Sequence, residues 1–465
     1  MTTVVDRPAS IPGSDTVHEK PVASTGSAPL AAVVGGDLVV PLVTGGRIRY
    51  ANLDIAASAP ALAAVAAHVA TVLPLYSSVH RGAGYASAVS TAAYEQARRE
   101  IGSFVGARTG DVVIVTRNTT DALNLLATAV PGPVVHLDIE HHANLLPWQA
   151  RGGRVVVAER TLAATLEAVR AELEREPAAL VTVTGASNVT GECLPLAELA
   201  RIAHHAGARL AVDAAQLAPH RRIDLAATGV DYLAFSGHKL YAPYGAGVLV
   251  GRRDWLDVAP PYLAGGGAVR SVTLEGTTWA DCPARHEAGT PNVVGAVALA
   301  AACRTIAALP GGAVEAHEES LLRRLLTGLT AVPGIRTLVL WPGEAERIGV
   351  VTFTVDGYPA ELVAQYLSAE HGIGLRDGRF CAHPLLDRFD VVGNGSPAGT
   401  AVRASVGLGS RLADVDRLVD ALVTLRRTGP SWTYADAGGG FLPVPDPRPL
   451  PAWLGVEAGE GAACA

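Results

Sequence analysis

The chain has 465 residues, of which 49% are hydrophobic and 17% are charged, a composition typical of a globular protein long enough for two domains. Its formal net charge of −7 argues against the basic surface that nucleic acids require, so we expect no nucleic-acid partner. No apolar run reaches the roughly 18 residues that cross a membrane, and we expect no membrane association. The five cysteines are scattered without zinc-site spacing, which predicts a cytoplasmic location and no metal site.

Short apolar runs alternate with helix-length segments over most of the chain. We interpret residues 1–45, which are rich in Ser, Thr, Pro and Gly, as a mobile leader. In residues 46–309 the pattern is typical of strands that are buried on both faces of a mostly parallel sheet and joined by helices. This region is predicted to be a large α/β domain. Its expected strands are 112–115, 134–137, 155–157, 180–183, 210–212, 232–235 and 247–250, and its expected helices are 120–128, 166–174, 196–205 and 293–309.

The pattern changes after residue 309. Residues 310–430 predict a smaller α+β domain packed against the first, with helices at 313–329, 359–371 and 413–426 and strands at 350–355 and 402–406. Residues 431–465 form a Pro/Gly-rich tail that we expect to be poorly ordered, although Trp453 and Leu454 can pin it to the body.

Only two residues of the chain are lysines, whereas 35 are arginines. Lys20 lies in the predicted leader, and Lys239 follows the buried strand expected at 232–235. Lysine, unlike arginine, can lose its proton and condense with an aldehyde. Lys239 is therefore the candidate for an imine with an aldehyde cofactor.

Pyridoxal phosphate requires an amine, a carboxylate for its ring nitrogen, a stacking group and a phosphate cup. Asp213 ends the strand at 210–212 and can hold the protonated ring nitrogen, although a helix-capping role stays open. Gln216 is close enough in sequence to reach the phenolic oxygen. Either His141 or His142 can lie flat against the ring.

Hydroxyl and imidazole side chains near two strand ends predict the phosphate cup. Thr119 and Thr120 follow the strand at 112–115 and open a helix, whose free backbone N–H groups attract anions. Ser236 and His238 come immediately before the lysine and can add donors to the same phosphate.

Together these segments resemble the fold-type I pyridoxal-phosphate enzymes of aminotransferase class V. Within that class, the group II cysteine desulfurases and selenocysteine lyases are most similar. The resemblance runs from about Asn52 to about Arg426. It rests on an ordered series of motifs at residues 52–58, 79–82, 140–148, 187–189, 212–216, 236–241, 275–279, 287–292 and 403–405.

The resemblance implies a role for each candidate residue and a homodimer with a shared active site. Lys239 is implied as the Schiff-base lysine, Asp213 as the partner of the ring nitrogen and His142 as the stacking histidine. Gln216 is implied as the partner of the phenolic oxygen. The implied phosphate ligands are Thr119, Thr120, Ser236, His238 and, from the second subunit, Thr290. The implied substrate-binding residues are Asn188, Arg376, Arg403 and His80.

Cys381 falls at the position of the persulfide-forming cysteine in the segment 376–384. A thiol attacks as its thiolate, and Arg379 and His383 nearby are expected to favour that form. The family usually has a pair of histidines just before this cysteine, whereas this chain has Arg379 and Phe380. A structural role as a small buried hydrophobic residue is the alternative for Cys381.

The expected reaction is conversion of L-cysteine to L-alanine with the sulfur held on Cys381, before transfer to a possible sulfur-acceptor protein. Another class V reaction in specialised biosynthesis remains open, namely C–S lyase, aminotransferase or epimerase chemistry, none of which needs Cys381. A non-catalytic family member would have a damaged site, and the sequence shows no such damage.

Overall fold

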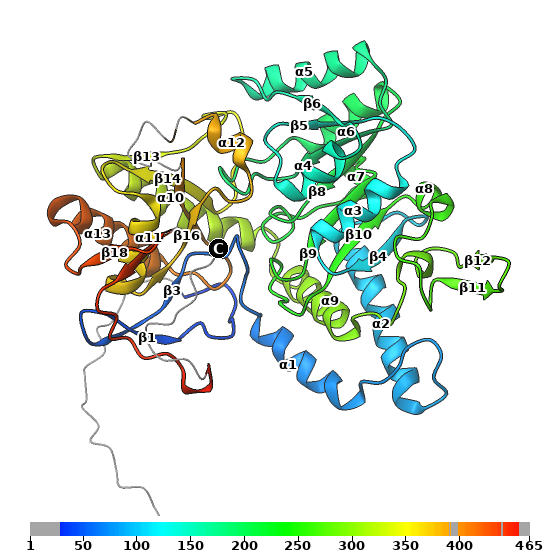
Figure 1. Cartoon of the computed structure of the whole chain (residues 1–465), viewed down its shortest axis with the longest axis horizontal. Coiled ribbons are helices and arrows are strands. Elements are labelled where there is room, and N and C mark those ends of the chain that lie inside the picture. The colour runs from blue at the N-terminus through cyan, green and yellow to red at the C-terminus, as the bar shows by residue number, and fades with distance from the viewer. Residues whose placement is uncertain (1–27, 390, 392–398, 439, 455–465) are drawn as a thin grey trace, which may run out of the picture.

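The computed structural model describes residues 28–389, 391, 399–438 and 440–454. Seven strands form the central sheet of the larger domain (Figure 1): β4 (Val112–Thr116), β5 (Val134–Leu137), β6 (Arg154–Val156), β7 (Leu180–Thr184), β8 (Arg209–Asp213), β9 (Tyr232–Ser236) and β10 (Gly247–Gly251). Their order is β4-β10-β9-β8-β7-β5-β6, and β10 runs antiparallel to both neighbours while the pairs from β9 to β6 are parallel. Each strand expected in this domain is present, which confirms the mostly parallel sheet.

Helices cover both faces of this sheet because successive residues of a buried strand point to opposite sides. Val113 packs in one layer and Ile114 in the other. The first layer contains α1 (Ala63–Val72), α2 (Tyr85–Phe104), α5 (Leu162–Arg175), α6 (Leu196–His205), α7 (Leu225–Thr228) and α9 (Val293–Ala307). The second contains α3 (Thr119–Ala129), α4 (His142–Gln149) and α8 (Asp254–Val258). This sandwich leaves the carboxyl ends of the strands free to form a site.

Short elements connect these helices. The 3-10 turns are η1 (Leu73–Leu75), directly after α1, and η2 (Ala284–His286), ahead of α9. A hairpin of β11 (Val269–Val272) and β12 (Thr277–Trp279) projects from the larger domain (Figure 1).

The smaller domain is an antiparallel sheet with helices packed against it, which confirms the predicted α+β character. Its strands are β13 (Ile335–Thr337), β14 (Val350–Val355), β16 (Arg376–Gly378) and β17 (Ala401–Ser405), in the order β13-β14-β17-β16. Its helices are α10 (Ala313–Ala331), α11 (Ala360–His371), α12 (His383–Asp387) and α13 (Leu412–Thr428). Leucines of α10 and α13 meet the apolar face of β14 in one core.

Residues 38–53 pack on the smaller domain, and residues 30–34 pack beside the start of α1, which differs from the leader that we expected up to residue 45. The strands β1 (Val39–Pro41) and β2 (Arg47–Arg49) form a hairpin, and β3 (Ala51–Asn52) pairs with β15 (Ile373–Gly374). Leu53 is fully buried in the core of the smaller domain, so apolar burial offsets the entropy of ordering this segment. The rest of the predicted leader, residues 1–27, lies outside the described residues.

The start of the C-terminal tail is held by a buried carboxylate rather than by the apolar residues that we expected. Glu370 accepts hydrogen bonds from the Ser431 and Trp432 backbone N–H groups at 3.0 and 3.1 Å and from the Tyr434 hydroxyl at 3.0 Å. Trp453 is 83% exposed. The tail forms β18 (Tyr434–Asp436), β19 (Phe441–Pro443) and η4 (Ala452–Leu454), and residues 439 and 455–465 lie outside the described residues.

Within the described ranges, no helix combines the length and the apolar character needed to cross a membrane.

Candidate active site

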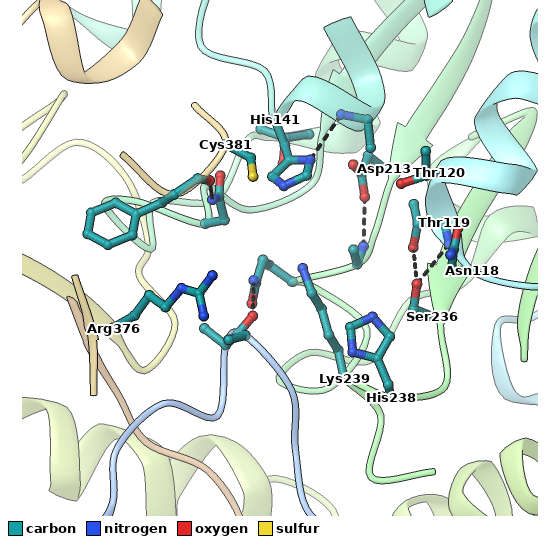
Figure 2. Close-up of a pocket in the computed structure, with 18 of the residues that line it drawn as sticks. Asn118, Thr119, Thr120, His141, Asp213, Ser236, His238, Lys239, Arg376 and Cys381 are labelled. Carbon is teal, nitrogen blue, oxygen red and sulfur yellow. Dashed lines mark hydrogen bonds between the residues drawn. The ribbon is translucent and has the colours of Figure 1, made fainter. Parts of the chain in front are cut away.

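A cavity of about 250 Å³ lies between the two domains, at the carboxyl ends of β4, β7, β8 and β9 (Figure 2). The larger domain supplies Lys239, Asp213 and the residues near the start of α3, and the smaller domain supplies Arg376, Cys381 and Arg403. Figure 2 shows the labelled side chains converging from both sides. The site is therefore complete only when the two domains pack together.

Lys239 extends into this cavity from the turn after β9. The turn is tight because a Cβ at Gly237 would lie only 2.9 Å from the carbonyl oxygens of Ala242 and Ala246. Burial lowers the pKa of the amine to about 8, a shift that Asp213 opposes and Arg403 reinforces. A substantial fraction of the amine is therefore neutral near physiological pH, which nucleophilic attack on an aldehyde requires.

Asp213 is a buried carboxylate at the end of β8. One of its oxygens accepts a hydrogen bond from the Ala215 backbone N–H at 2.9 Å. Burial raises its pKa, while that hydrogen bond and the charge of Lys239 lower it. A protonated ring nitrogen beside this carboxylate would offset the cost of burying its charge.

The start of α3 and the end of β9 form a cup of donors. Thr119 contacts the Ser236 hydroxyl through its backbone N–H at 2.8 Å and through its own hydroxyl at 2.7 Å. Asn118 caps the helix by accepting the Asp121 N–H at 2.9 Å, and Thr120 lines the cavity beside it. Helix N-termini favour anions, so this cup suits a phosphate group.

His141 forms another wall of the cavity, and its ring is labelled in Figure 2. Its Nδ1 accepts the Ala143 backbone N–H at 3.0 Å, which places the proton of the neutral ring on Nε2. Burial lowers its pKa to about 3, and the charges of Lys239, His142 and Arg403 act in the same direction. The imidazole is therefore neutral and suited to stacking.

Two arginines face each other across strands β16 and β17. Arg376 is the register partner of Arg403, although like charges directly opposite each other repel. Arg403 is buried and donates to the Asn188 carbonyl at 3.0 Å and more weakly to Asp54 at 3.4 Å, but its buried Nε has no partner. Burial lowers its pKa to about 10. A bound carboxylate would satisfy the Nε donor and relieve the repulsion.

Cys381 is an exposed thiol on a strained turn at the cavity wall. Phe380 and Cys381 have φ angles of 51° and 52°, in the left-handed region that costs a residue with a side chain about 1–3 kcal/mol. Two hydrogen bonds of 2.8 Å hold the turn, from Asn188 Nδ2 to the Phe380 carbonyl and from the His142 N–H to the Cys381 carbonyl. The sulfur is thus held in place rather than carried on a free loop.

Comparison with known proteins matches residues 51–418 to the family described as Aminotransferase class-V. The chain belongs to this family. A cysteine desulfurase of Dickeya dadantii is 39% identical over 399 residues, which cover 83% of this chain and 93% of that protein. A cysteine desulfurase of Klebsiella pneumoniae is 37% identical over 366 residues, which cover 76% and 87%.

Solved structures agree with the sequence relatives. The apo cysteine desulfurase of Thermococcus onnurineus superimposes with a TM-score of 0.74 at 31% identity and covers 81% of this chain and 95% of its own. A cysteine desulfurase of Escherichia coli gives a TM-score of 0.70 at 32% identity and covers 80% and 94%. The resemblance inferred from the motifs is therefore confirmed.

The structure of this class V enzyme brings most of the predicted site residues together. Those that line the one cavity are Lys239, Asp213, Gln216, Thr119, Thr120, Ser236, His238, Asn188, Arg376, Arg403 and Cys381. Gln216 donates to the Ala56 carbonyl at 2.8 Å, which orients its side chain.

Our expectation that His142 stacks on the ring differs from the structure, which places its neighbour His141 in the cavity. His142 is the first residue of α4 and its ring packs edge-on against His383, with 4.6 Å between ring centroids. Consecutive side chains at a helix start diverge, so only one of the two histidines can face the cavity. We therefore transfer the proposed stacking role to His141.

His80 and Thr290 do not line the cavity of their own chain. His80 lies between η1 and α2, where its ring contacts Glu95 at 2.9 Å and its side chain is 44% exposed. Thr290 is exposed in the loop before α9.

Arg379 and His383, which we expected to favour the thiolate of Cys381, both have other partners in the structure. Arg379 forms an ion pair with Asp387, and the ring of His383 packs edge-on against His142. Sequence reasoning missed two neighbours of Arg403, namely the ring of Phe380 and the weakly bound carboxylate of Asp54. For Asp54, the sequence signal was a carboxylate that directly follows an apolar residue, Leu53.

Proposed function

We propose that this class V enzyme is a pyridoxal-phosphate-dependent cysteine desulfurase that converts L-cysteine to L-alanine and retains the sulfur as a persulfide on Cys381. One observation carries the proposal: Lys239, Asp213, Arg403 and Cys381 all line a single small cavity. The amine and the carboxylate suit the cofactor, the guanidinium suits an amino-acid carboxylate, and the thiol suits sulfur transfer. The relatives named as cysteine desulfurases support the same reading.

The residues present fit pyridoxal phosphate. The partly uncompensated carboxylate of Asp213 matches a protonated ring nitrogen, and the donors around Ser236 match a phosphate. The neutral ring of His141 supplies a flat partner for stacking. Lys239 is the one lysine among the described residues, and its amine is the attachment point.

When bound, pyridoxal phosphate supplies an aldehyde for Lys239 and a ring that withdraws electrons from the α-carbon of the substrate. Arg403, with Arg376 opposite, orients the substrate through its carboxylate. Lys239 Nζ, once displaced by the substrate amine, takes the proton from the α-carbon as a general base. Asp213 holds the proton at the ring nitrogen.

Cys381 performs the sulfur step. Its Sγ, as thiolate, attacks the substrate sulfur and forms the S–S bond, while the bond between Cβ and that sulfur breaks. The electron pair of the broken bond stays with Cβ, which takes up a proton from solvent and becomes a methyl group, and Lys239 returns its proton to the α-carbon to complete alanine. The sulfur is oxidised and the carbon is reduced, so the step needs no outside oxidant or reductant.

A homodimer with a shared active site is part of the proposal. The exposure of His80 and Thr290 outside their own cavity supports a role for both residues in the site of a second copy. Exposed apolar side chains near His80, including Tyr76 and the 79% exposed Tyr85, support a buried contact there. A sulfur-acceptor protein would reach the exposed Cys381, and the free thiols of the described cysteines support a cytoplasmic location.

The pH dependence of cofactor attachment follows from the pKa of Lys239. The neutral amine reacts, so the rate at which apoprotein gains near-visible absorbance with added pyridoxal phosphate should rise with pH and level off above about 8. Nα-acetyl-lysine, with an ordinary amine, should continue to accelerate toward pH 10. An apoprotein rate that still climbs at pH 10 would contradict a buried amine.

Product identification tests the function directly. Holoenzyme incubated with L-cysteine should release alanine and should carry one extra sulfur atom on the tryptic peptide containing Cys381, detected by mass spectrometry. Pyruvate and ammonia would instead indicate a C–S lyase, a keto acid would indicate an aminotransferase, and recovery of D-cysteine would indicate an epimerase.

A further inference from the structure

Phe380 lies against the guanidinium of Arg403. The Cζ atom of Arg403 is 5.1 Å from the centre of the ring, within the range of a cation–π contact. The ring is only 8% exposed, so the contact lies in a region shielded from water. The chain departs from the histidine pair of the resembled family at this position and the one before it.

The backbone of the same residue begins the turn that carries the sulfur. Its carbonyl accepts the hydrogen bond from Asn188 Nδ2, and the Asn188 carbonyl in turn accepts the hydrogen bond from Arg403. Phe380 is therefore linked to Arg403 in two ways. Its ring contacts the guanidinium directly, and its carbonyl is connected to Arg403 through the hydrogen bonds of Asn188. Cys381 follows immediately, with both residues fixed in left-handed conformations.

These contacts connect the guanidinium of Arg403, proposed to bind the substrate carboxylate, with the turn that carries the thiol of Cys381. If Arg403 moves, the ring and Asn188 move with it, and the turn that holds Cys381 is displaced. An aliphatic side chain would fill the same space but would provide no π-face for the cation.

We propose that Phe380 is a positioning residue that fixes the separation between the carboxylate site at Arg403 and the sulfur of Cys381. The inference rests on the proposed function and deepens it, because it identifies what sets the span of the substrate.

Three variants of the holoenzyme test the role. Phe380→Leu keeps an apolar side chain but removes the ring face, and Phe380→Tyr keeps the ring. Phe353→Leu is the matched control, since Phe353 is buried in β14 opposite Val402, the neighbour of Arg403, and packs in the core of the smaller domain. We expect Phe380→Leu to raise KM for L-cysteine by about 3-fold to 30-fold and to lower kcat as well.

Phe380→Tyr should restore KM to within about 2-fold of the wild type, and Phe353→Leu should lower thermal stability while leaving KM within the same range. The inference fails if Phe380→Leu leaves KM unchanged, if Phe380→Tyr behaves like Phe380→Leu, or if Phe353→Leu raises KM equally. Those results would assign the ring to general packing.

A separate readout distinguishes failure of this inference from failure of the proposed function. Binding of L-alanine to the holoenzyme, followed by the change in visible absorbance, requires the carboxylate site but no sulfur step. If the wild type releases no alanine from L-cysteine, the proposed function fails. The positioning role of Phe380 is then tested by the dissociation constant for L-alanine. That constant should rise about 3-fold to 30-fold in Phe380→Leu and recover in Phe380→Tyr, and an unchanged value would overturn the inference.

Discussion

Replacing Lys239 with alanine should abolish both the near-visible absorbance of the holoenzyme and the release of alanine from L-cysteine. The side chain is proposed to serve twice, as the attachment point and as the general base, and general bases alone contribute about 10²–10⁴-fold. We therefore expect the rate to fall by at least about 10³-fold. Lys239→Arg should be equally inactive, because a guanidinium stays protonated and cannot take the proton.

Because the chain has only two lysines, the site of cofactor attachment can be assigned without ambiguity. With Lys20→Arg as the control background, the chain has a single lysine, so borohydride reduction in the presence of pyridoxal phosphate can label only Lys239 or the α-amino group. The Lys20→Arg control should retain full activity and full label. A Lys239→Ala protein that still gained colour and still released alanine would refute the proposed mechanism.

The strands of the larger domain were predictable because each is a short apolar run, and all but the edge strand β6 are largely buried on both faces. Helix α2 was not predicted, because its buried face includes Ser87, Ser90 and Ala97, and such small residues give a weak hydrophobic period. They suit close packing against the alanine-rich α9. The strand β3 is only two residues long and depends on Ile373, far along the chain, so no local pattern indicates it.

Within the site, the sequence could identify residue types at strand ends but could not orient neighbouring side chains. Asp213 and Ser236 were predictable because each ends a buried strand at the same edge of the sheet. The choice between His141 and His142 depends on the backbone at the start of α4, where the first caps the helix and the second begins it. The contact between Phe380 and Arg403 depends on the packing of β17 against a turn and has no sequence signal.

Asp213 and Lys239 illustrate why these groups act as a unit. Burial raises the pKa of the acid and lowers that of the amine, and each charge partly counters the shift of the other. The fold therefore couples the protonation of the two groups. Removing either charge should move the pKa of the other further from its ordinary value.

Replacing Cys381 with alanine should remove alanine production from L-cysteine, by at least about 100-fold, while leaving the cofactor spectrum intact. Lys239 and Asp213 are untouched in this variant, so exchange of the α-hydrogen of L-alanine with deuterated water, followed by NMR, should continue at a rate within a few-fold of the wild type. Loss of alanine production together with continued hydrogen exchange would show that Cys381 acts in the sulfur step and not in the removal of the α-proton.

Cys193→Ala is the matched control for this loss of a thiol. Cys193 lies away from the cavity, and burial raises its pKa to about 12, so it stays protonated and is a poor nucleophile. Its replacement should leave alanine release unchanged. If Cys381→Ala still released alanine and sulfide at the full rate, the thiol on the strained turn would be dispensable, and a C–S bond cleavage that needs no protein thiol would replace the desulfurase mechanism.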